Sequence, residues 1–245
     1  MQCARTAHVD VVTPPRAERR NFREDARTYH SRAPSLVHAR GRVSVSMTPP
    51  ALPPPDEPVA FRTFCLFLLA FHLSEFALAF HYNPRELGWR SFLLSKPYAV
   101  AMGAAALEFH LEWRFFAERK EAAVATTFYA GVVMCLFGDW LRKASICTAG
   151  TAFTHLIQTR RRPTHFLVTT GAYAYARHPG YLGWFAWALG TQVMLGNPVC
   201  FVAFVVVTWL YFKRRIAVEE LYLRRMFSEY EDYARRVPTW IPGIK

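Results

Sequence analysis

The sequence VAFRTFCLFLLAFHLSEFALAFHY at residues 59–82 decides the fold class. It carries almost no charge, and at about 1.5 Å of rise per residue it is long enough to cross a hydrocarbon core of about 30 Å as a helix. It stops at Asn83-Pro84. A soluble helical protein would have to bury this whole stretch, so we predict a transmembrane helix.

Further hydrophobic segments follow, and they show no internal repeat. They lie at residues 97–117, 122–141, 181–196 and 198–212. The first is opened by Pro97, which suits a helix start, and is amphipathic. The last two are joined by Gly196-Asn197-Pro198 and predict a tight helical hairpin that spans or re-enters the membrane. After the basic run 213–215, residues 216–236 predict an amphipathic helix facing the cytosol. The predicted fold is an all-α polytopic integral membrane helix bundle with about five hydrophobic helices.

Composition excludes several other classes of protein. Of 245 residues, 52% are hydrophobic and 16% are aromatic, which excludes a disordered chain. The net charge is +12, but it is spread along the chain without a recognition-helix pattern, so we expect no nucleic-acid partner. The five cysteines form no C-x-x-C pair, so neither a zinc site nor a disulfide framework is expected.

The first part of the chain reads as a separate segment. Residues 1–45 are rich in arginine and 46–58 are rich in proline, so we divide the chain into a basic arm at 1–58 and a membrane domain at 59–245. Three spans before the loop at 142–180 would place the arm on the opposite side from that loop, against the positive-inside tendency. We therefore favour translation from Met47, with the preceding arm absent from the native protein.

The polar stretch at 142–180 is too long for a simple connection and favours an ordered functional loop. Its end, Arg177-His178-Pro179-Gly180-Tyr181, runs into a hydrophobic helix, and the N–H groups of that first turn form a positive end suited to an anionic group. The alternative is a basic, aromatic anchor at the membrane surface, which we favour for Arg160–Arg162.

Charged residues elsewhere allow two interpretations. Arg215 and Glu219 are spaced i,i+4, with Glu220 adjacent, and such a pair is commonplace on a surface helix. Directly after a membrane helix, however, it becomes a candidate for function. Within the hydrophobic segments, polar contacts between helices are the preferred role, and a substrate-lining role is the alternative. These residues are His72, Glu75, Glu108 and His110.

Several motifs together resemble the protein-S-isoprenylcysteine O-methyltransferase family. They are FH at 71–72, SE at 74–75, LEF at 107–109, LRKA at 141–144, TAG at 148–150, LVTTGAY at 167–173, RHPGYLGW at 177–184, GTQVMLGNP at 190–198, Arg215 with Glu219 and Glu220, and RVPT at 236–239. The match covers about residues 70–243. The Arg-His-Pro block occurs in other membrane enzymes too, whereas the GTQVML and LRKA runs are highly specific. Gly180 departs from the family, where serine is common.

The resemblance implies an enzyme of the endoplasmic reticulum membrane that uses S-adenosylmethionine and no metal, with its active site facing the cytosol. Its substrates would be prenylated CaaX proteins of the small GTPase type, methylated on the C-terminal prenylcysteine carboxylate. By motif, the cofactor would be bound by Gln158, His165, Phe166, Leu167, Val168, Tyr173, His178, Pro179, Gly180 and Tyr181. Arg215 and Glu219 would serve the substrate, Arg215 as the carboxylate holder and Glu219 as the residue that holds Arg215. Trp184, Phe185 and Trp187 would line the lipid path or, as we favour for any single one, pack the bundle.

Three alternatives remain at this point. A phospholipid N-methyltransferase would share the Arg-His-Pro block, but its amine substrate gives no reason for Arg215 at the acceptor. A sterol-reductase-like enzyme would need a longer chain. A non-enzymatic membrane scaffold would have no reason to bind the cofactor product S-adenosylhomocysteine.

Overall fold

The computed structural model describes residues 55–161 and 165–244, and this part of the chain contains helices and no strand. Residues 1–54 of the arm predicted at 1–58, with the alternative start at Met47, lie outside the described residues, and its last two residues belong to a helix. Helix α2 (Glu57–Tyr82) begins slightly before the predicted residue 59. Asp56 caps it, since its Oδ1 atom accepts a hydrogen bond from the Val59 amide at 2.9 Å, and Pro58 occupies the first turn.

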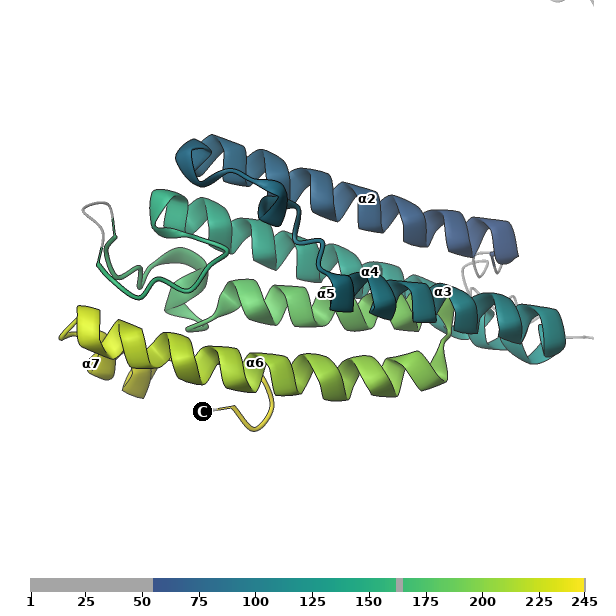
Figure 1. The fold of residues 1–245 in the computed structure, drawn as a ribbon. Coiled ribbons are helices and arrows are strands. Elements are labelled where there is room, and N and C mark those ends of the chain that lie inside the picture. Colours follow the sequence, from purple (N-terminus) through teal and green to yellow (C-terminus); the bar gives the residue numbers. More distant parts are fainter. Residues whose placement is uncertain (1–54, 162–164, 245) are drawn as a thin grey trace, which may run out of the picture. The chain divides into compact units, whose positions relative to one another are not determined.

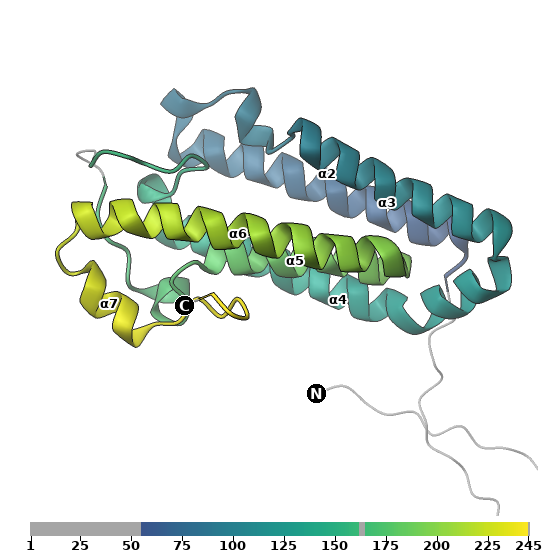
Figure 2. The ribbon, with the colours of Figure 1, turned by 60° about the horizontal axis from the view of Figure 1, so that its bottom comes forward.

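Long helices lie side by side and form the bundle (Figure 1). After α2 come α3 (Lys96–Phe115), α4 (Ala117–Ala149), α5 (Pro179–Leu195) and α6 (Pro198–Met226), and the short α7 (Tyr230–Arg236) lies near the end of α6. Two short 3₁₀ helices, Pro84–Glu86 and Trp89–Phe92, connect α2 to α3. The segment between α4 and α5 and helix α7 gather at one end of the bundle, as a second view shows (Figure 2).

Two predicted boundaries were wrong. The helix expected at 122–141 extends over Ala117–Ala149, so residues 142–149 are helical and not part of a loop. The basic run at 213–215 does not end a helix either, because Lys and Arg are good helix formers and α6 continues to Met226. The predicted amphipathic helix at 216–236 is therefore the end of α6 followed, after a break at 227–229, by α7.

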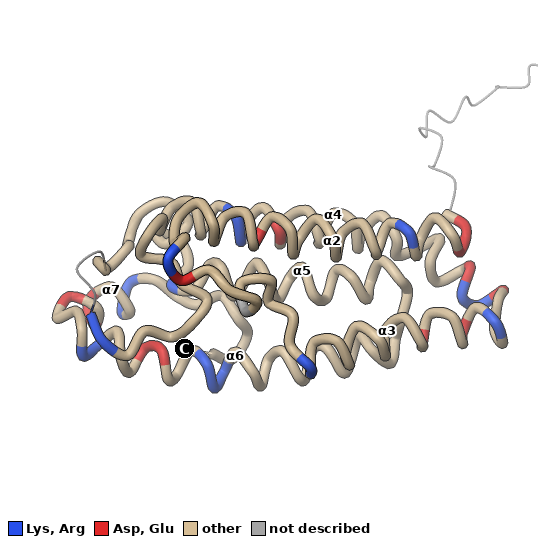
Figure 3. The backbone as a smooth tube through the Cα atoms, turned by 45° about the horizontal axis from the view of Figure 1, so that its top comes forward, with Lys and Arg blue, Asp and Glu red and all other residues tan. Residues whose placement is uncertain are grey.

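The outer faces of the bundle are apolar. Helix α2 and the segment Ala117–Ala152 are long and apolar enough to span a bilayer. In the most apolar 18 residues of each, only 22% and 28% are buried inside the bundle. Leu66, Leu73, Val133 and Phe137 are among their exposed side chains. Charged residues lie mostly toward the two ends of the helices (Figure 3). A soluble protein would not expose this much apolar surface, whereas lipid covers it without penalty.

Helices α4 and α5 approach each other through glycines spaced seven residues apart. A Cβ atom on Gly131 would lie 2.1 Å from the Met194 nitrogen, and one on Gly138 would lie 2.5 Å from the Trp187 nitrogen. A Cβ atom on Gly183 of α5 would lie 2.6 Å from the Gly138 oxygen. Small residues of this kind let two helix backbones pack closely in a membrane.

Polar residues inside the bundle join helices to one another. His72 of α2 is hydrogen-bonded to the Tyr98 hydroxyl of α3 at 2.7 Å. Glu108 of α3 accepts hydrogen bonds from the Val199 and Cys200 amides at the start of α6, at 2.8 and 2.6 Å. These contacts satisfy groups that lipid could not satisfy.

Buried charges dock α7 and the C-terminal segment against α6. The Arg177 side chain donates to Glu220 at 2.9 Å and to the carbonyl oxygens of Ala234 and Val237 at 3.1 and 2.6 Å. The Arg177 amide donates to the Pro238 oxygen at 3.0 Å. The loop before α5 is therefore tied to both α6 and the end of the chain.

The glycine contact gives the first prediction. Gly138→Ala inserts a methyl group where the α5 backbone lies, so the two helices must separate, and overpacking of this kind costs about 1–3 kcal/mol of unfolding free energy. We expect a lower melting temperature of the purified protein in detergent, measured with a thiol-reactive dye. Gly103→Ala is the matched control, since nothing lies within 4 Å of its added methyl group. Equal melting temperatures for the two variants would contradict the contact.

The second prediction concerns Glu220, which lies beyond the basic run of α6 and outside its apolar part. Burial raises the pKa of Glu220, but the hydrogen bond from His178 and the charge of Arg177 outweigh it and hold the pKa at about 2, below its ordinary value of 4.5. The ion pair therefore stabilises the fold fully above pH 4.5, and this stability is lost as the pH falls toward 2.

Glu220→Gln should lower stability at pH 7 by about 3–5 kcal/mol, because it leaves Arg177 buried without its partner charge. We expect the difference in melting temperature between wild type and variant to be constant from pH 8 to 6 and to shrink below pH 4.5. A difference that stays the same down to pH 3 would show that the charge of Glu220 does not stabilise the fold.

Candidate functional site

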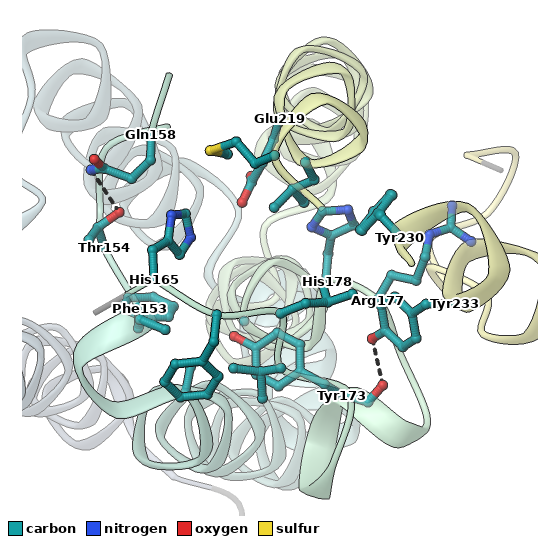
Figure 4. A pocket seen from close by; sticks show the side chains of 18 of the residues that line it. Phe153, Thr154, Gln158, His165, Tyr173, Arg177, His178, Glu219, Tyr230 and Tyr233 are labelled. Atoms are coloured by element: carbon teal, nitrogen blue, oxygen red, sulfur yellow. Dashed lines mark hydrogen bonds between the residues drawn. The ribbon is translucent and has the colours of Figure 1, made fainter. Parts of the chain in front are cut away.

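A pocket opens at the end of the bundle where α4 ends and α5 begins (Figure 4). Its walls come from the 3₁₀ helix Gly150–Ala152, the segments 153–158 and 165–168, the 3₁₀ helix Gly171–Ala174, the first turn of α5, the end of α6 and the start of α7. The lining residues are Ala149, Ala152, Phe153, Thr154, Leu156, Gln158, His165, Phe166, Leu167, Val168, Tyr173, Arg177, His178, Gly180, Tyr181, Glu219, Leu223, Met226, Tyr230 and Tyr233.

The residues predicted for the cofactor lie together in this one pocket. Those that line it are Gln158, His165, Phe166, Leu167, Val168, Tyr173, His178, Gly180 and Tyr181. Pro179 is buried in the first turn of α5 and is not part of the wall. Residues from separate stretches of the chain thus face one space, as the resemblance implied for all of them except Pro179.

The two predicted substrate residues meet through a tyrosine. Arg215 Nε donates to the Tyr181 hydroxyl at 2.8 Å, and that hydroxyl donates to Glu219 at 2.5 Å. We expected Glu219 to hold Arg215, and in the structure Tyr181 lies between the two and links them. Glu219 lines the pocket, whereas Arg215 lies just outside the wall.

Neutral oxygen atoms hold the Arg215 guanidinium. Besides Tyr181, its Nη1 atom donates to the Tyr211 hydroxyl at 3.2 Å and its Nη2 atom donates to the His155 carbonyl oxygen at 2.7 Å. A guanidinium has five N–H donors, and these contacts with described residues use three. One N–H donor on each terminal nitrogen remains for a ligand.

Gly180, which stands where serine is common in the family, is packed closely against its neighbours. A Cβ atom on Gly180 would lie 2.9 Å from Ser145 Oγ and 3.5 Å from the Phe153 ring. A serine there would force Ser145 or its neighbours to move. The glycine therefore fits the packing of α5 against α4 in this chain.

Several wall residues were missed by sequence reasoning. Leu223, Met226, Tyr230 and Tyr233 come from the region predicted as a surface helix. Their spacing of three, four and three residues is a helical apolar stripe, and this pattern was the available signal. Arg177 also lines the pocket, but its charge is directed to Glu220 and the carbonyls of α7.

The tyrosines of the pocket keep their protons. Burial and the nearby charge of Glu219 raise the pKa of Tyr173 above its usual range, and burial raises the pKa of Tyr233 to about 12. The protonated Tyr233 hydroxyl donates to the Tyr173 carbonyl oxygen at 2.6 Å, which fixes the 3₁₀ helix against α7 (Figure 4).

The tryptophan expected either in a lipid path or in the core lies in the core. Trp187 is fully buried, and its ring stacks on Phe71 with ring centroids 4.1 Å apart. Trp184 and Phe185 are partly buried and pack against Phe212. Among the described residues, no group of three or more His, Cys, Asp and Glu side chains is arranged to hold a metal ion.

Comparison with known proteins agrees with the motifs. The profile of the isoprenylcysteine carboxyl methyltransferase family matches residues 131–225. Protein-S-isoprenylcysteine O-methyltransferase of Rattus norvegicus is 44% identical over 188 residues, which are 76% of this chain and 66% of the rat protein. A probable protein-S-isoprenylcysteine O-methyltransferase of Oryza sativa subsp. indica is 44% identical over 185 residues, which are 74% of this chain and 95% of the rice protein.

A solved structure shows the same fold. The eukaryotic intramembrane Ras methyltransferase, an isoprenylcysteine carboxyl methyltransferase, superposes with a TM-score of 0.73 at 37% identity, covering 79% of this chain and 70% of that one. The predicted all-α membrane helix bundle is thereby confirmed. This chain spans just under two thirds of the length of the vertebrate relatives and nearly all of the rice relative. With 44% identity over nearly the whole of the rice protein and a shared membrane fold, the chain belongs to the isoprenylcysteine carboxyl methyltransferase family.

Proposed function

We propose that this protein transfers a methyl group from S-adenosylmethionine to the C-terminal carboxylate of prenylated cysteine, giving a methyl ester. The observation that carries the proposal is the joining of the pocket to Arg215 through Tyr181. One end of the site offers a cavity of mixed aromatic and polar character, and the other offers a guanidinium with two donors that the described residues leave unused.

The donor set of the pocket fits S-adenosylmethionine. The cofactor has an aromatic base, hydroxyl groups and a cationic sulfonium, and when bound it supplies an electrophilic methyl group. Phe166, Leu223 and Met226 offer apolar surface for the base, while Gln158 offers an amide. Among the described residues that line the pocket, Glu219 is the one carboxylate, and it suits a cationic ligand.

The acceptor chemistry explains the residues that the site contains. The carboxylate of a C-terminal cysteine has a pKa of about 3.3–3.7 and is ionised at pH 7, so no general base is required. Its reactivity depends on loss of water and on orientation, and orientation alone contributes up to about 7–11 kcal/mol in favourable cases. We assign Arg215 to orienting the carboxylate. Tyr181 and the His155 carbonyl hold Arg215 in place, and Glu219 accepts the hydrogen bond of the Tyr181 hydroxyl.

Two alternatives are less well supported. A phospholipid amine acceptor would be repelled by a guanidinium with free donors, whereas a carboxylate is attracted. A scaffold would have no use for a pocket whose walls come from separated segments and end at a buried ion pair. The family membership of the chain supports the methyltransferase as well.

The setting proposed for this reaction is the endoplasmic reticulum membrane, with the site on the cytosolic face. Arginine and lysine concentrate at the site end, at 142–143, 160–161, 213–215, 224–225 and 235–236, and the cytosolic side of membrane proteins is enriched in these residues. The bilayer would supply the lipid part of the substrate, and the cytosol would supply both the cofactor and prenylated CaaX proteins of the small GTPase type.

The direct test is cofactor binding and methyl transfer by the purified full chain. We expect calorimetry to show saturable binding of S-adenosylhomocysteine, and we expect methylation of an N-acetyl-S-prenylcysteine in detergent micelles. Phosphatidylethanolamine serves as the competing acceptor. Methylation of the phospholipid alone would support the N-methyltransferase, and absence of S-adenosylhomocysteine binding would leave the scaffold.

Arg215→Ala should lower kcat/KM for the prenylcysteine about 10- to 100-fold, as expected for the loss of hydrogen bonds to a charged group. Its dissociation constant for S-adenosylhomocysteine should change little, because Arg215 lies outside the pocket wall. Arg215→Lys should be impaired too, since an ammonium cannot present two parallel donors. An equal loss of cofactor binding would contradict this separation of roles.

The orientation gives a further prediction. A protease-cleavable tag after Lys245 should be cut in sealed microsomes, because the C-terminal segment contacts the loop at 175–177 at the site end. A tag placed just before Asp56 should be protected, because α2 starts at the opposite end of the bundle from the site (Figure 1). Cleavage of both tags would show that one of the three helices before the site does not cross the membrane.

A further inference from the structure

The carboxylate of Glu75 is the most completely enclosed charge in the described structure. It has no exposed surface, although it lies on α2, whose outer face is apolar. Arg142 of α4 donates to its two oxygens from Nε and Nη2, both at 2.8 Å. His155 Nε2 donates at 2.9 Å and Lys143 Nζ at 3.4 Å. One carboxylate thus receives four donors from two parts of the chain.

The third guanidinium nitrogen of Arg142 contacts the wall of the pocket that we propose binds the cofactor. Its Nη1 atom donates to the carbonyl oxygen of Gly180 at 3.0 Å. Gly180 lines the pocket in the first turn of α5. Because the guanidinium is planar and rigid, the direction of the Glu75 fork fixes the direction of the Nη1 donor.

His155, which binds Glu75, also contacts Arg215, the residue that we assign to the acceptor carboxylate. The His155 side chain binds Glu75, and its own carbonyl oxygen accepts the hydrogen bond from Arg215 Nη2 at 2.7 Å. His155 lies on an irregular segment with no helix to hold it in place. Its side chain is anchored by the bond to Glu75 and by the perpendicular contact with Phe153, with 5.5 Å between ring centroids.

We propose that Glu75 is a positioning residue for the methyl transfer: through His155 it places the carbonyl that orients Arg215, and through Arg142 it places the Gly180 wall. The proposal rests on the proposed function and adds residues that touch neither substrate nor cofactor. A contact between helices needs no ion pair, since removing charges from water is expensive and apolar side chains pack α2 on α4 equally well. The burial of the Glu75 carboxylate is explained if its donors set two positions in the site. Arg142 sets the position of the Gly180 carbonyl, and His155 sets that of Arg215.

The test varies His155, because removing Glu75 leaves Arg142 buried without a partner and can unfold the protein. His155→Phe keeps the ring and loses the donor to Glu75, while His155→Gln places an amide N–H near the position of Nε2. Glu108→Gln is the matched control. Glu108 is also a bundle carboxylate, but it caps the start of α6 near Val199, 16 residues before Arg215 and hence about 24 Å away along the helix.

The readouts are KM and kcat for N-acetyl-S-prenylcysteine and the dissociation constant for S-adenosylhomocysteine, with melting temperature as a check on folding. We expect His155→Phe to raise the acceptor KM about tenfold, with cofactor binding changed by less than about twofold and with His155→Gln close to wild type. Glu108→Gln should leave KM unchanged.

Two results would overturn the proposal. One is an unchanged acceptor KM in His155→Phe, and the other is equal impairment of the Phe and Gln variants. An inactive wild type that still binds S-adenosylhomocysteine would instead refute the proposed acceptor, so the two failures are distinguishable.

Discussion

The close approach of α4 and α5 is the constraint on which the site depends. Gly131 and Gly138 on one helix and Gly183 on the other leave no room for a side chain between the two backbones. Only at this separation does Arg142 on α4 reach the carbonyl of Gly180 on α5. The first turn of α5 is thus fixed to α4 by backbone contact along its length and by a guanidinium at its start, which gives the pocket one rigid wall.

Charge is placed at the ends of the bundle, where it joins elements that apolar packing leaves apart. At the site end, Glu75 joins α2 to α4, and Glu220 joins the loop before α5 to α6. At the opposite end, Glu108 joins α3 to the start of α6. The middle of the bundle is apolar and suits the hydrocarbon core of a bilayer. The ion pairs and hydrogen bonds named above lie toward the two ends of the bundle.

Tyr181 connects the two chemical tasks of the proposed enzyme. Its hydroxyl accepts from Arg215 and donates to Glu219, so the guanidinium stays free to use its remaining donors on a ligand. A direct pairing of Arg215 with Glu219 would have used those donors. The tyrosine therefore keeps a strong cation next to a carboxylate without neutralising it, and this arrangement suits an anionic acceptor beside a cationic methyl donor.

The sequence by itself determined the helical membrane architecture and half of the residues that line the pocket, because hydrophobic length and motif order are local properties of the chain. It misplaced the end of α4 and divided α6, because the burial of Arg142 and Ile216 depends on partners far away in the sequence. Only the tertiary structure decided that Tyr181 separates Arg215 from Glu219, that the end of α6 and α7 close the pocket, and that Glu75 reaches both sides of it. Each of these depends on groups that the fold brings within about 3 Å of each other although they lie 34 to 80 residues apart in the chain, and no local pattern encodes such contacts.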